Sequence, residues 1–272
     1  MNPNYQTTHF SPVNRAFQYG DSVKSFFFVR FGKLIMAEES YFFLMASMRK
    51  MRMHIPLTYT LEFFQNLLED KMKNEAFSNG IISFMAFRVR TEEQLQKAQT
   101  DFFMELIPLH DVLAIQENVE LDIMKEINVN TGLLDNIHVP CAENIYAEIY
   151  AYENGLNDVI LLNPQKRIAR CATGNMLLLC GDKIRIPKQS EGAYVSPLME
   201  NLVTYIHKNK LAEISEEELI PFETQKADEI LLISEFKGIF SVEKIRNRNF
   251  GSERFSAMIA DWRSSLENQL SH

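Results

Sequence analysis

Few residues of this sequence stand in spacings that could carry out chemistry. The sequence has no P-loop, G-x-G-x-x-G, G-x-S-x-G or H-E-x-x-H pattern, and its six histidines lack metal-site spacing. One local pattern that could hold a ligand is Ser196-Pro197, which opens a predicted helix. Free N–H groups and the helix dipole attract anions at such a position. Ser196 could equally serve only as a helix cap.

Composition and charge exclude several classes of partner. The formal net charge is −8 and no long basic block occurs, so nucleic acid is not an expected partner. No apolar run approaches the roughly 18 residues that a membrane span requires. Cys141, Cys171 and Cys180 cannot all pair and form no C-x-x-C, which favours reduced thiols. With no signal-peptide pattern, the sequence predicts a cytoplasmic protein without a metal site.

The elements that must position any site alternate between strands and helices. This alternation predicts an α+β or α/β fold of two domains, a smaller α/β domain over residues 1–116 and a larger mixed-sheet domain over 117–272. In the first domain we expect strands over 25–31, 33–36 and 81–88. A helix with Tyr41, Leu44, Met48 and Met51 on one face should end before Pro56. A second helix capped by Thr60 and a charged helical segment from Thr91 should follow.

The sequence of the second domain contains clearer turn and helix-cap signals. Gly181-Asp182 separates two β-rich runs and predicts a two-residue hairpin turn of type II′. We expect strands over 158–163, 175–180, 183–187 and 229–233. Helices should cover 143–154, where Gly155 stops the first, and begin at Ser196-Pro197. A last helix should carry on one face Phe255, Met258, Ile259, Trp262 and Leu266.

Several segments, in order along nearly the whole chain, resemble a known family. Asn14–Asp21 (NRAFQYGD) is similar to the opening motif of class IV aminotransferases, and Leu44–Met53 resembles the helix that follows it. Glu153–Asp158, Gly174–Leu177 and Ala227–Ile230 resemble the core of the second domain in that family. The family includes D-amino-acid and branched-chain aminotransferases and 4-amino-4-deoxychorismate lyases. The resemblance implies their two-domain fold, called fold type IV, and a homodimer.

The resemblance also implies pyridoxal phosphate (PLP) as the cofactor, bound as a Schiff base to a lysine. Counting back from the motif at 153–156, Ile137 holds the place of that lysine, and its neighbours Asn136 and His138 cannot form an imine. In the family, the lysine amine at this position anchors the cofactor and moves protons. Here the position carries a hydrocarbon side chain instead.

Further positions depart from the family pattern. Phe43 replaces an arginine that grips the cofactor phosphate, and Arg170 replaces a glutamate that faces the pyridine nitrogen. Ser196-Pro197 and Ile233-Ser234 stand where the family has a phosphate cup and a threonine-bearing turn. Losing two hydrogen bonds to a charged group would weaken binding by roughly 3–6 kcal/mol. The remnant pocket implied by the resemblance comprises Phe43, Ile137, His138, Arg170, Asn175, Ser196 and Ser234.

Three functions remain open at this point. The first is a degenerate family member without PLP chemistry, a pseudoenzyme that could hold a small anionic ligand in the remnant pocket. The second is an active PLP-dependent aminotransferase or 4-amino-4-deoxychorismate lyase that uses a relocated lysine, Lys125 or Lys188. The third is catalysis without a cofactor, with His138 as the base. Arg170 could bind a carboxylate ligand or pair with a local acid.

Overall fold

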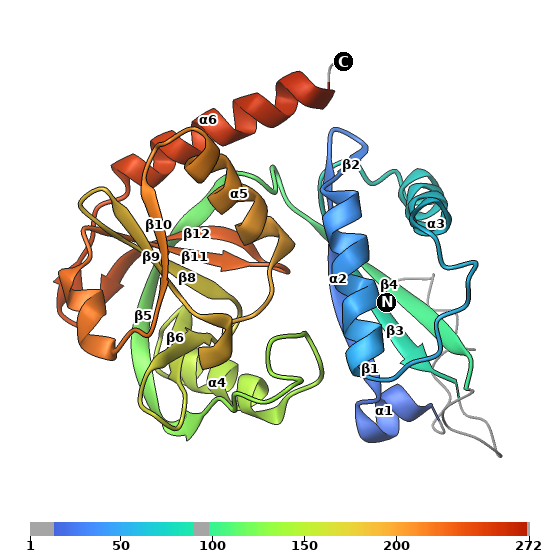
Figure 1. Ribbon diagram of the computed structural model, residues 1–272, viewed down its shortest axis with the longest axis horizontal. Helices are drawn as coiled ribbons and strands as arrows, with labels where there is room; N and C mark the ends of the chain where they lie inside the picture. Colours follow the sequence, from blue (N-terminus) through green and yellow to red (C-terminus); the bar gives the residue numbers. More distant parts are fainter. Residues whose placement is uncertain (1–13, 90–97, 271–272) are drawn as a thin grey trace. The chain divides into compact units, whose positions relative to one another are not determined.

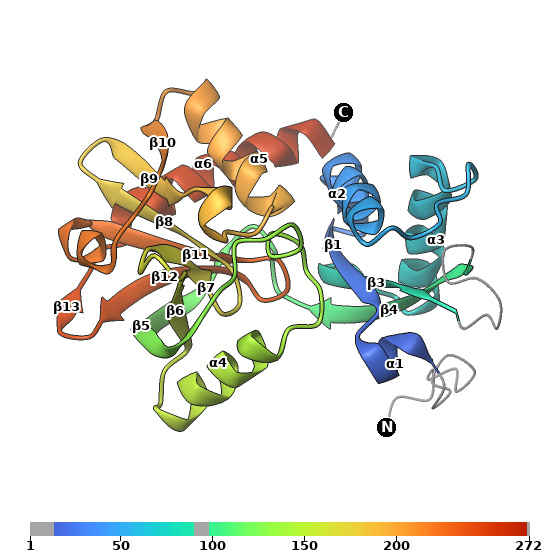
Figure 2. The same ribbon diagram turned by 60° about the horizontal axis from the view of Figure 1, so that its bottom comes forward.

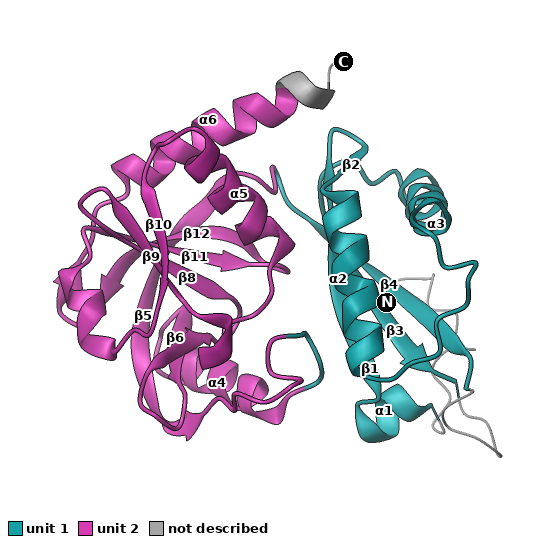
Figure 3. Ribbon diagram, viewed as in Figure 1, with its two compact units in different colours: residues 1–110, 137–140 teal, residues 111–136, 141–272 magenta. Residues whose placement is uncertain are grey.

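The computed structural model describes residues 14–89 and 98–270 and divides the chain into two compact units (Figure 3). Unit 1 comprises residues 1–110 and 137–140, and unit 2 comprises residues 111–136 and 141–272. The predicted boundary between residues 116 and 117 falls inside unit 2, near the start of a strand, β5 (Ile115–Asn128). The fold is mixed α/β, as the alternation of elements predicts.

Unit 1 is built on a four-stranded antiparallel sheet in the order β2-β1-β3-β4 (Figure 1). The predicted helical segment from Thr91 lies, over residues 91–97, outside the described residues, and the chain continues as strand β4. The strands are β1 (Ser22–Arg30), β2 (Lys33–Ile35), β3 (Gly80–Arg88) and β4 (Thr100–Pro108).

The first predicted hairpin is confirmed, with limits that differ by a few residues. Strand β1 ends at Arg30 because Phe31 and Gly32 take positive φ values of 50° and 70° and form the turn. Met36, predicted as strand, also has a positive φ, 52°, and leads into helix α2 instead. The pattern of apolar and polar side chains does not predict such left-handed residues. Only glycine adopts this backbone conformation easily, and these positions are not all glycine.

The helices in the described part of unit 1 are α1 (Arg15–Tyr19), α2 (Ala37–Lys50) and α3 (Leu61–Asn74). Helix α2 stops before the predicted Pro56, because the N–H of Met53 bonds to the carbonyl of Met48 at 2.9 Å with Arg52 left-handed. The predicted cap of α3 is confirmed, since the Thr60 side chain accepts the N–H of Phe63.

Helices α2 and α3 cover one face of this sheet (Figure 2). Phe64 of α3 packs edge-on against Phe84 of β3 and Phe102 of β4, with ring centroids 5.5 Å and 5.4 Å away. The methionine-rich end of α2 packs into the core, since Met45 and Met48 are buried.

Unit 2 contains a nine-stranded mixed sheet in the order β10-β9-β8-β11-β12-β5-β6-β7, with β13 paired to β12. The β8–β9 hairpin has the predicted limits, and Gly181 has the positive φ, 56°, that the first position of its turn requires. Besides β5, the strands are β6 (Asp158–Leu162), β7 (Ile168–Cys171), β8 (Asn175–Cys180), β9 (Lys183–Pro187), β10 (Glu213–Glu217), β11 (Glu229–Ser234), β12 (Gly238–Ile245) and β13 (Arg248–Asn249).

Three α-helices and two 3₁₀ helices accompany this sheet: α4 (Ala142–Glu153), η3 (Gln189–Glu191), α5 (Pro197–Lys208), η4 (Pro221–Lys226) and α6 (Glu253–Leu270). Alternate residues of β5, such as Val119 and Leu121, join a buried cluster with β6, β8, β11 and β12. Ala147 and Ala151 of α4 belong to a second cluster that includes Val159 of β6. The predicted apolar face of α6 is confirmed, and Trp262 is among its buried residues.

Candidate functional site

Residues 137–140 form a short extension at the edge of the sheet of unit 1. The N–H of Lys24 on β1 bonds to the carbonyl of His138 at 2.8 Å, and the two residues form an antiparallel bridge. Ile137, which the resemblance assigns to the place of the Schiff-base lysine, is only 3% exposed. A buried hydrocarbon side chain therefore occupies this position.

His138 lies among aromatic rings. Its ring is edge-on to Phe26 and to Phe43, with centroids 5.1 Å and 6.0 Å away. Three of the predicted pocket residues, Phe43, Ile137 and His138, are thus gathered in unit 1, and all three are buried. This arrangement places apolar rings beside the imidazole and puts no cationic side chain at position 43.

Arg170 on β7 is bonded within unit 2. Its Nη1 donates to the carbonyl oxygens of Gly192 at 2.6 Å and Asp135 at 3.2 Å, and its Nη2 donates to Asn144 Oδ1 at 3.3 Å. The guanidinium carbon lies 4.1 Å from the centroid of the Tyr194 ring. Arg170 is 3% exposed, and these contacts leave its guanidinium bonded to neutral oxygens.

The side chain of Asn175 on β8 bonds to the backbone of the same tyrosine. The Asn175 amide donates to the carbonyl of Tyr194 at 2.8 Å and accepts the N–H of Tyr194 at 2.9 Å. Burial raises the pKa of Tyr194, an effect that the nearby Arg170 charge partly offsets. Arg170 and Asn175 are therefore brought together around Tyr194, in a cluster whose hydrogen bonds lie inside the protein.

Ser196 caps helix α5, as its sequence predicts, and its hydroxyl has a second partner. Its Oγ accepts the N–H of Met199 at 3.1 Å and donates to Oε1 of Glu235. The same Glu235 oxygen accepts the N–H of Leu198 at 3.1 Å. The buried carboxyl group of Glu235, directly after β11, thus accepts hydrogen bonds from the Ser196 hydroxyl and the Leu198 N–H at the start of α5.

Burial raises the pKa of Glu235 to about 8, and the hydrogen bonds from Ser196 and Leu198 only partly oppose this shift. Sequence reasoning missed Glu235, because a single glutamate after an apolar strand reads as a loop residue. Ser234 is buried beside it, and its Oγ accepts the N–H of Lys237 at 3.2 Å within the turn into β12.

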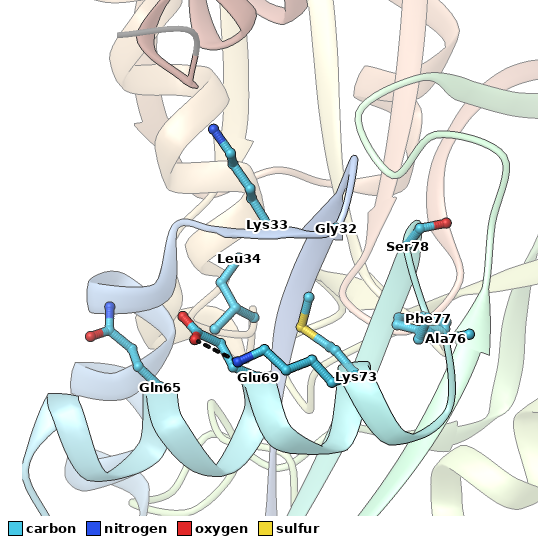
Figure 4. Close-up of a pocket in the computed structure, with 10 residues that line it drawn as sticks. Gly32, Lys33, Leu34, Gln65, Glu69, Lys73, Ala76, Phe77 and Ser78 are labelled. Atoms are coloured by element: carbon cyan, nitrogen blue, oxygen red, sulfur yellow. Dashed lines mark ion pairs between the residues drawn. The ribbon is translucent and has the colours of Figure 1, made fainter.

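A cavity of about 540 Å³ in unit 1 does not include these residues. It lies between the β1–β2 turn and α3 (Figure 4). Glu69 and Lys73 face it from successive turns of α3, with their charged atoms 3.9 Å apart. None of the seven predicted pocket residues lines this cavity.

Metal sites and membrane spans have no counterpart among the described residues. No group of three or more His, Cys, Asp or Glu side chains in that part of the chain could hold a metal ion. Within the same residues, no helix is long and apolar enough to cross a membrane.

The chain belongs to the class IV aminotransferases, because the model of that family, amino-transferase class IV, matches residues 43–245. This match confirms the family resemblance and spans the segments quoted from Leu44 to Ile230, whereas Asn14–Asp21 lies outside the matched residues. No curated protein sequence matches the chain significantly.

Solved structures show the same fold at low sequence identity. A branched-chain aminotransferase from Thermoproteus uzoniensis is 16% identical, covers 92% of this chain and 86% of its own, and gives a TM-score of 0.81. The 4-amino-4-deoxychorismate lyase of Pseudomonas aeruginosa is 16% identical over 92% of this chain and 93% of its own, with a TM-score of 0.75. A hypothetical aminotransferase from Mycobacterium tuberculosis in a PLP-bound form is 14% identical over 93% and 92%, with a TM-score of 0.78.

The described residues do not fit the groups that PLP requires. A PLP site needs a lysine amine, donors for the phosphate, and a polar group free to face the pyridine nitrogen. Here Ile137 offers no amine, and the Ser196 hydroxyl and Leu198 N–H are already bonded to Glu235. The two Nη atoms of Arg170 are bonded to two carbonyl oxygens and an amide, whereas its buried Nε has no hydrogen-bond partner among the described residues. At Ile137 the amine is absent, and at the start of α5 the contacts with Glu235 would first have to break.

Proposed function

We propose that this chain is a degenerate class IV aminotransferase homologue, a pseudoenzyme that keeps the family fold without PLP chemistry. The observation that carries the proposal is the Glu235 carboxyl group bonded to Ser196 and Leu198. The resemblance assigns this end of α5 to the cofactor phosphate, and a phosphate would find these two donors taken. When ionised, the carboxyl group would also repel the phosphate charge.

The small anionic ligand predicted for the remnant pocket remains a prediction. Arg170 and Ser196, the two residues expected to hold it, bond to other groups of the protein. A ligand at Ser196 would have to displace Glu235, and a ligand at Arg170 would have to displace the carbonyls of Gly192 and Asp135. Both exchanges lower the affinity, since the free protein already satisfies the Ser196 hydroxyl and the Nη1 atom of Arg170.

A direct test is to mix the purified chain with PLP, record its visible spectrum, reduce with borohydride and map the peptides. We expect the spectrum of free PLP and no specifically labelled lysine. One lysine labelled stoichiometrically would overturn the proposal. A class IV relative with an intact lysine serves as the positive control for trapping.

The second candidate is an active PLP-dependent aminotransferase or 4-amino-4-deoxychorismate lyase with a relocated lysine. One observation favours it: Lys24 pairs with His138 across the strand edge, next to the position that Ile137 occupies. The two lysines predicted from the sequence are less suited, since Lys125 is exposed on β5 and Lys188 is ion-paired with Glu218. Peptide mapping separates these cases, because label at Lys24 would support this candidate and label at no lysine would reject it.

We also propose a cytoplasmic homodimer, as family membership and the reduced thiols suggest. Support for a subunit contact is the apolar surface of α4, where Ile145, Ile149 and Tyr152 are 60%, 52% and 85% exposed. Light scattering coupled to gel filtration tests the dimer, and a monomer mass at micromolar concentration would reject it.

A further inference from the structure

A second cavity of unit 1 collects positive charge. It measures about 350 Å³ and is lined by Arg15, Arg52 and Arg88 together with Asp21 and Tyr19. The opening motif of the sequence builds one wall, because α1 and its C-terminal neighbours run along the cavity. This volume is within the range of roughly 300–1,000 Å³ that small-molecule sites occupy.

Among the described residues that line this cavity, arginines outnumber acids. Asp21 accepts Arg15 Nε at 2.8 Å on one carboxylate oxygen and Arg88 Nη1 on the other. Arg88 also donates to the carbonyl of Met51 and is 8% exposed, so its guanidinium is fixed. Asp21 is the only acid among the described residues that line the cavity. Three positive charges less one negative charge give these described lining residues a net charge of +2.

Arg52 occupies a backbone position that favours glycine. It follows α2 in the left-handed conformation, with φ 52°, while the N–H groups of Arg52 and Met53 bond to the carbonyls of Arg49 and Met48. This helix-terminating motif usually carries glycine at its left-handed residue. The left-handed backbone is strained at an exposed arginine. The requirements of folding alone therefore do not explain why this position carries arginine instead of glycine.

We propose that this cavity binds a small phosphate monoester that carries an aromatic group. The charge of a dianion matches the net charge of these lining residues, and guanidinium groups bind phosphate oxygens with paired N–H donors. The donors in question are those of Arg52 and those of Arg15 that Asp21 does not hold. The Arg15 guanidinium lies 4.9 Å from the centroid of Tyr19, and Tyr19 is 69% exposed. The phenol ring thus offers a flat surface beside the charges, on which an aromatic ligand can stack.

The test is titration calorimetry of the full chain with phenyl phosphate, inorganic phosphate and phenol at low ionic strength. We expect phenyl phosphate to bind most tightly and phenol not to bind. Arg52→Gly should weaken phenyl phosphate binding at least about tenfold while leaving the melting temperature unchanged or raised, since glycine relieves the backbone. Tyr19→Ala should weaken the binding of phenyl phosphate more than that of inorganic phosphate.

Arg246→Gly is the matched control. Arg246 is also exposed and left-handed, with φ 55°, but it lies in unit 2 and pairs with Asp122. This variant should bind phenyl phosphate as the parent does. No binding at millimolar phenyl phosphate, or equal affinities of Arg52→Gly and the parent, would overturn the inference. The experiment uses no PLP, so its result is separate from the test of the proposed function.

Discussion

The hydroxyl of Ser196 donates a hydrogen bond to the carboxyl group of Glu235, a residue 39 positions further along the chain. The N–H of Leu198 donates to the same oxygen, so the first turn of α5 is capped by two side chains at once. Helix starts of this kind commonly bind external anions. In this protein an internal group holds those donors.

Removing the Glu235 side chain should open that place. We expect Glu235→Ala to lower the free energy of unfolding by about 2–4 kcal/mol, because it leaves a cavity and unsatisfied buried donors. Inorganic phosphate should then raise the melting temperature of this variant more than that of the parent. Glu191→Ala is the control, since Glu191 is also buried but bonds to Asn163 and Arg167. Equal phosphate responses of the two variants would contradict the prediction.

The raised pKa of Glu235 predicts a specific pH dependence. Its pKa is about 8 in the folded protein against an ordinary 4.5, so folding takes up a proton between these values. The stabilising contribution is complete below about pH 4.5 and is lost as the pH rises through about 8. Urea unfolding should show stability falling by on the order of 1 kcal/mol per pH unit in this window. Glu235→Gln should flatten that slope, and a parallel slope in the variant would refute the assignment.

An amine at the position that the resemblance assigns to the Schiff-base lysine should not restore the cofactor site. Ile137→Lys places a charge where the parent side chain is 3% exposed, so we expect a loss of several kcal/mol of stability. Borohydride should still trap no PLP on the introduced amine while Glu235 is present, because the phosphate donors remain bonded. Val139→Lys, at a half-buried neighbour, should cost less. Efficient trapping by Ile137→Lys alone would show that Glu235 is no obstacle.

Arg170 should be important for stability. Arg170→Ala leaves the carbonyls of Gly192 and Asp135 without this donor and removes the contact with Tyr194, so we expect a loss of about 2–4 kcal/mol. Arg167→Ala is the comparison, because Arg167 forms partly exposed ion pairs that typically contribute less than about 1 kcal/mol. Chemical denaturation measures both variants. Equal losses would show that the buried contacts of Arg170 add nothing.

The elements that could be predicted from the sequence are those with a local cause. The β8–β9 hairpin has its predicted limits because Gly181 supplies the turn, and α5 begins where Ser196-Pro197 indicates. The left-handed Phe31, Met36 and Arg52 gave no such signal, and they shifted the ends of β1, β2 and α2.

The candidate site was less predictable because its contacts are not local. Ser196 was found from its own helix, whereas its partner Glu235 comes from a distant strand and has no motif. Strand β4 was missed for a related reason, since its conformation depends on its pairing with β3, which is distant in the sequence.

Residues 137–140 belong to unit 1 although the chain on both sides of them belongs to unit 2. The polypeptide therefore passes from one unit to the other three times, and neither unit is a continuous stretch of sequence. A fragment that stops at residue 110 would lack the backbone partner of Lys24 at the edge of its sheet. Cutting the gene once cannot yield two complete halves, so any dissection of this protein needs a permuted or grafted chain.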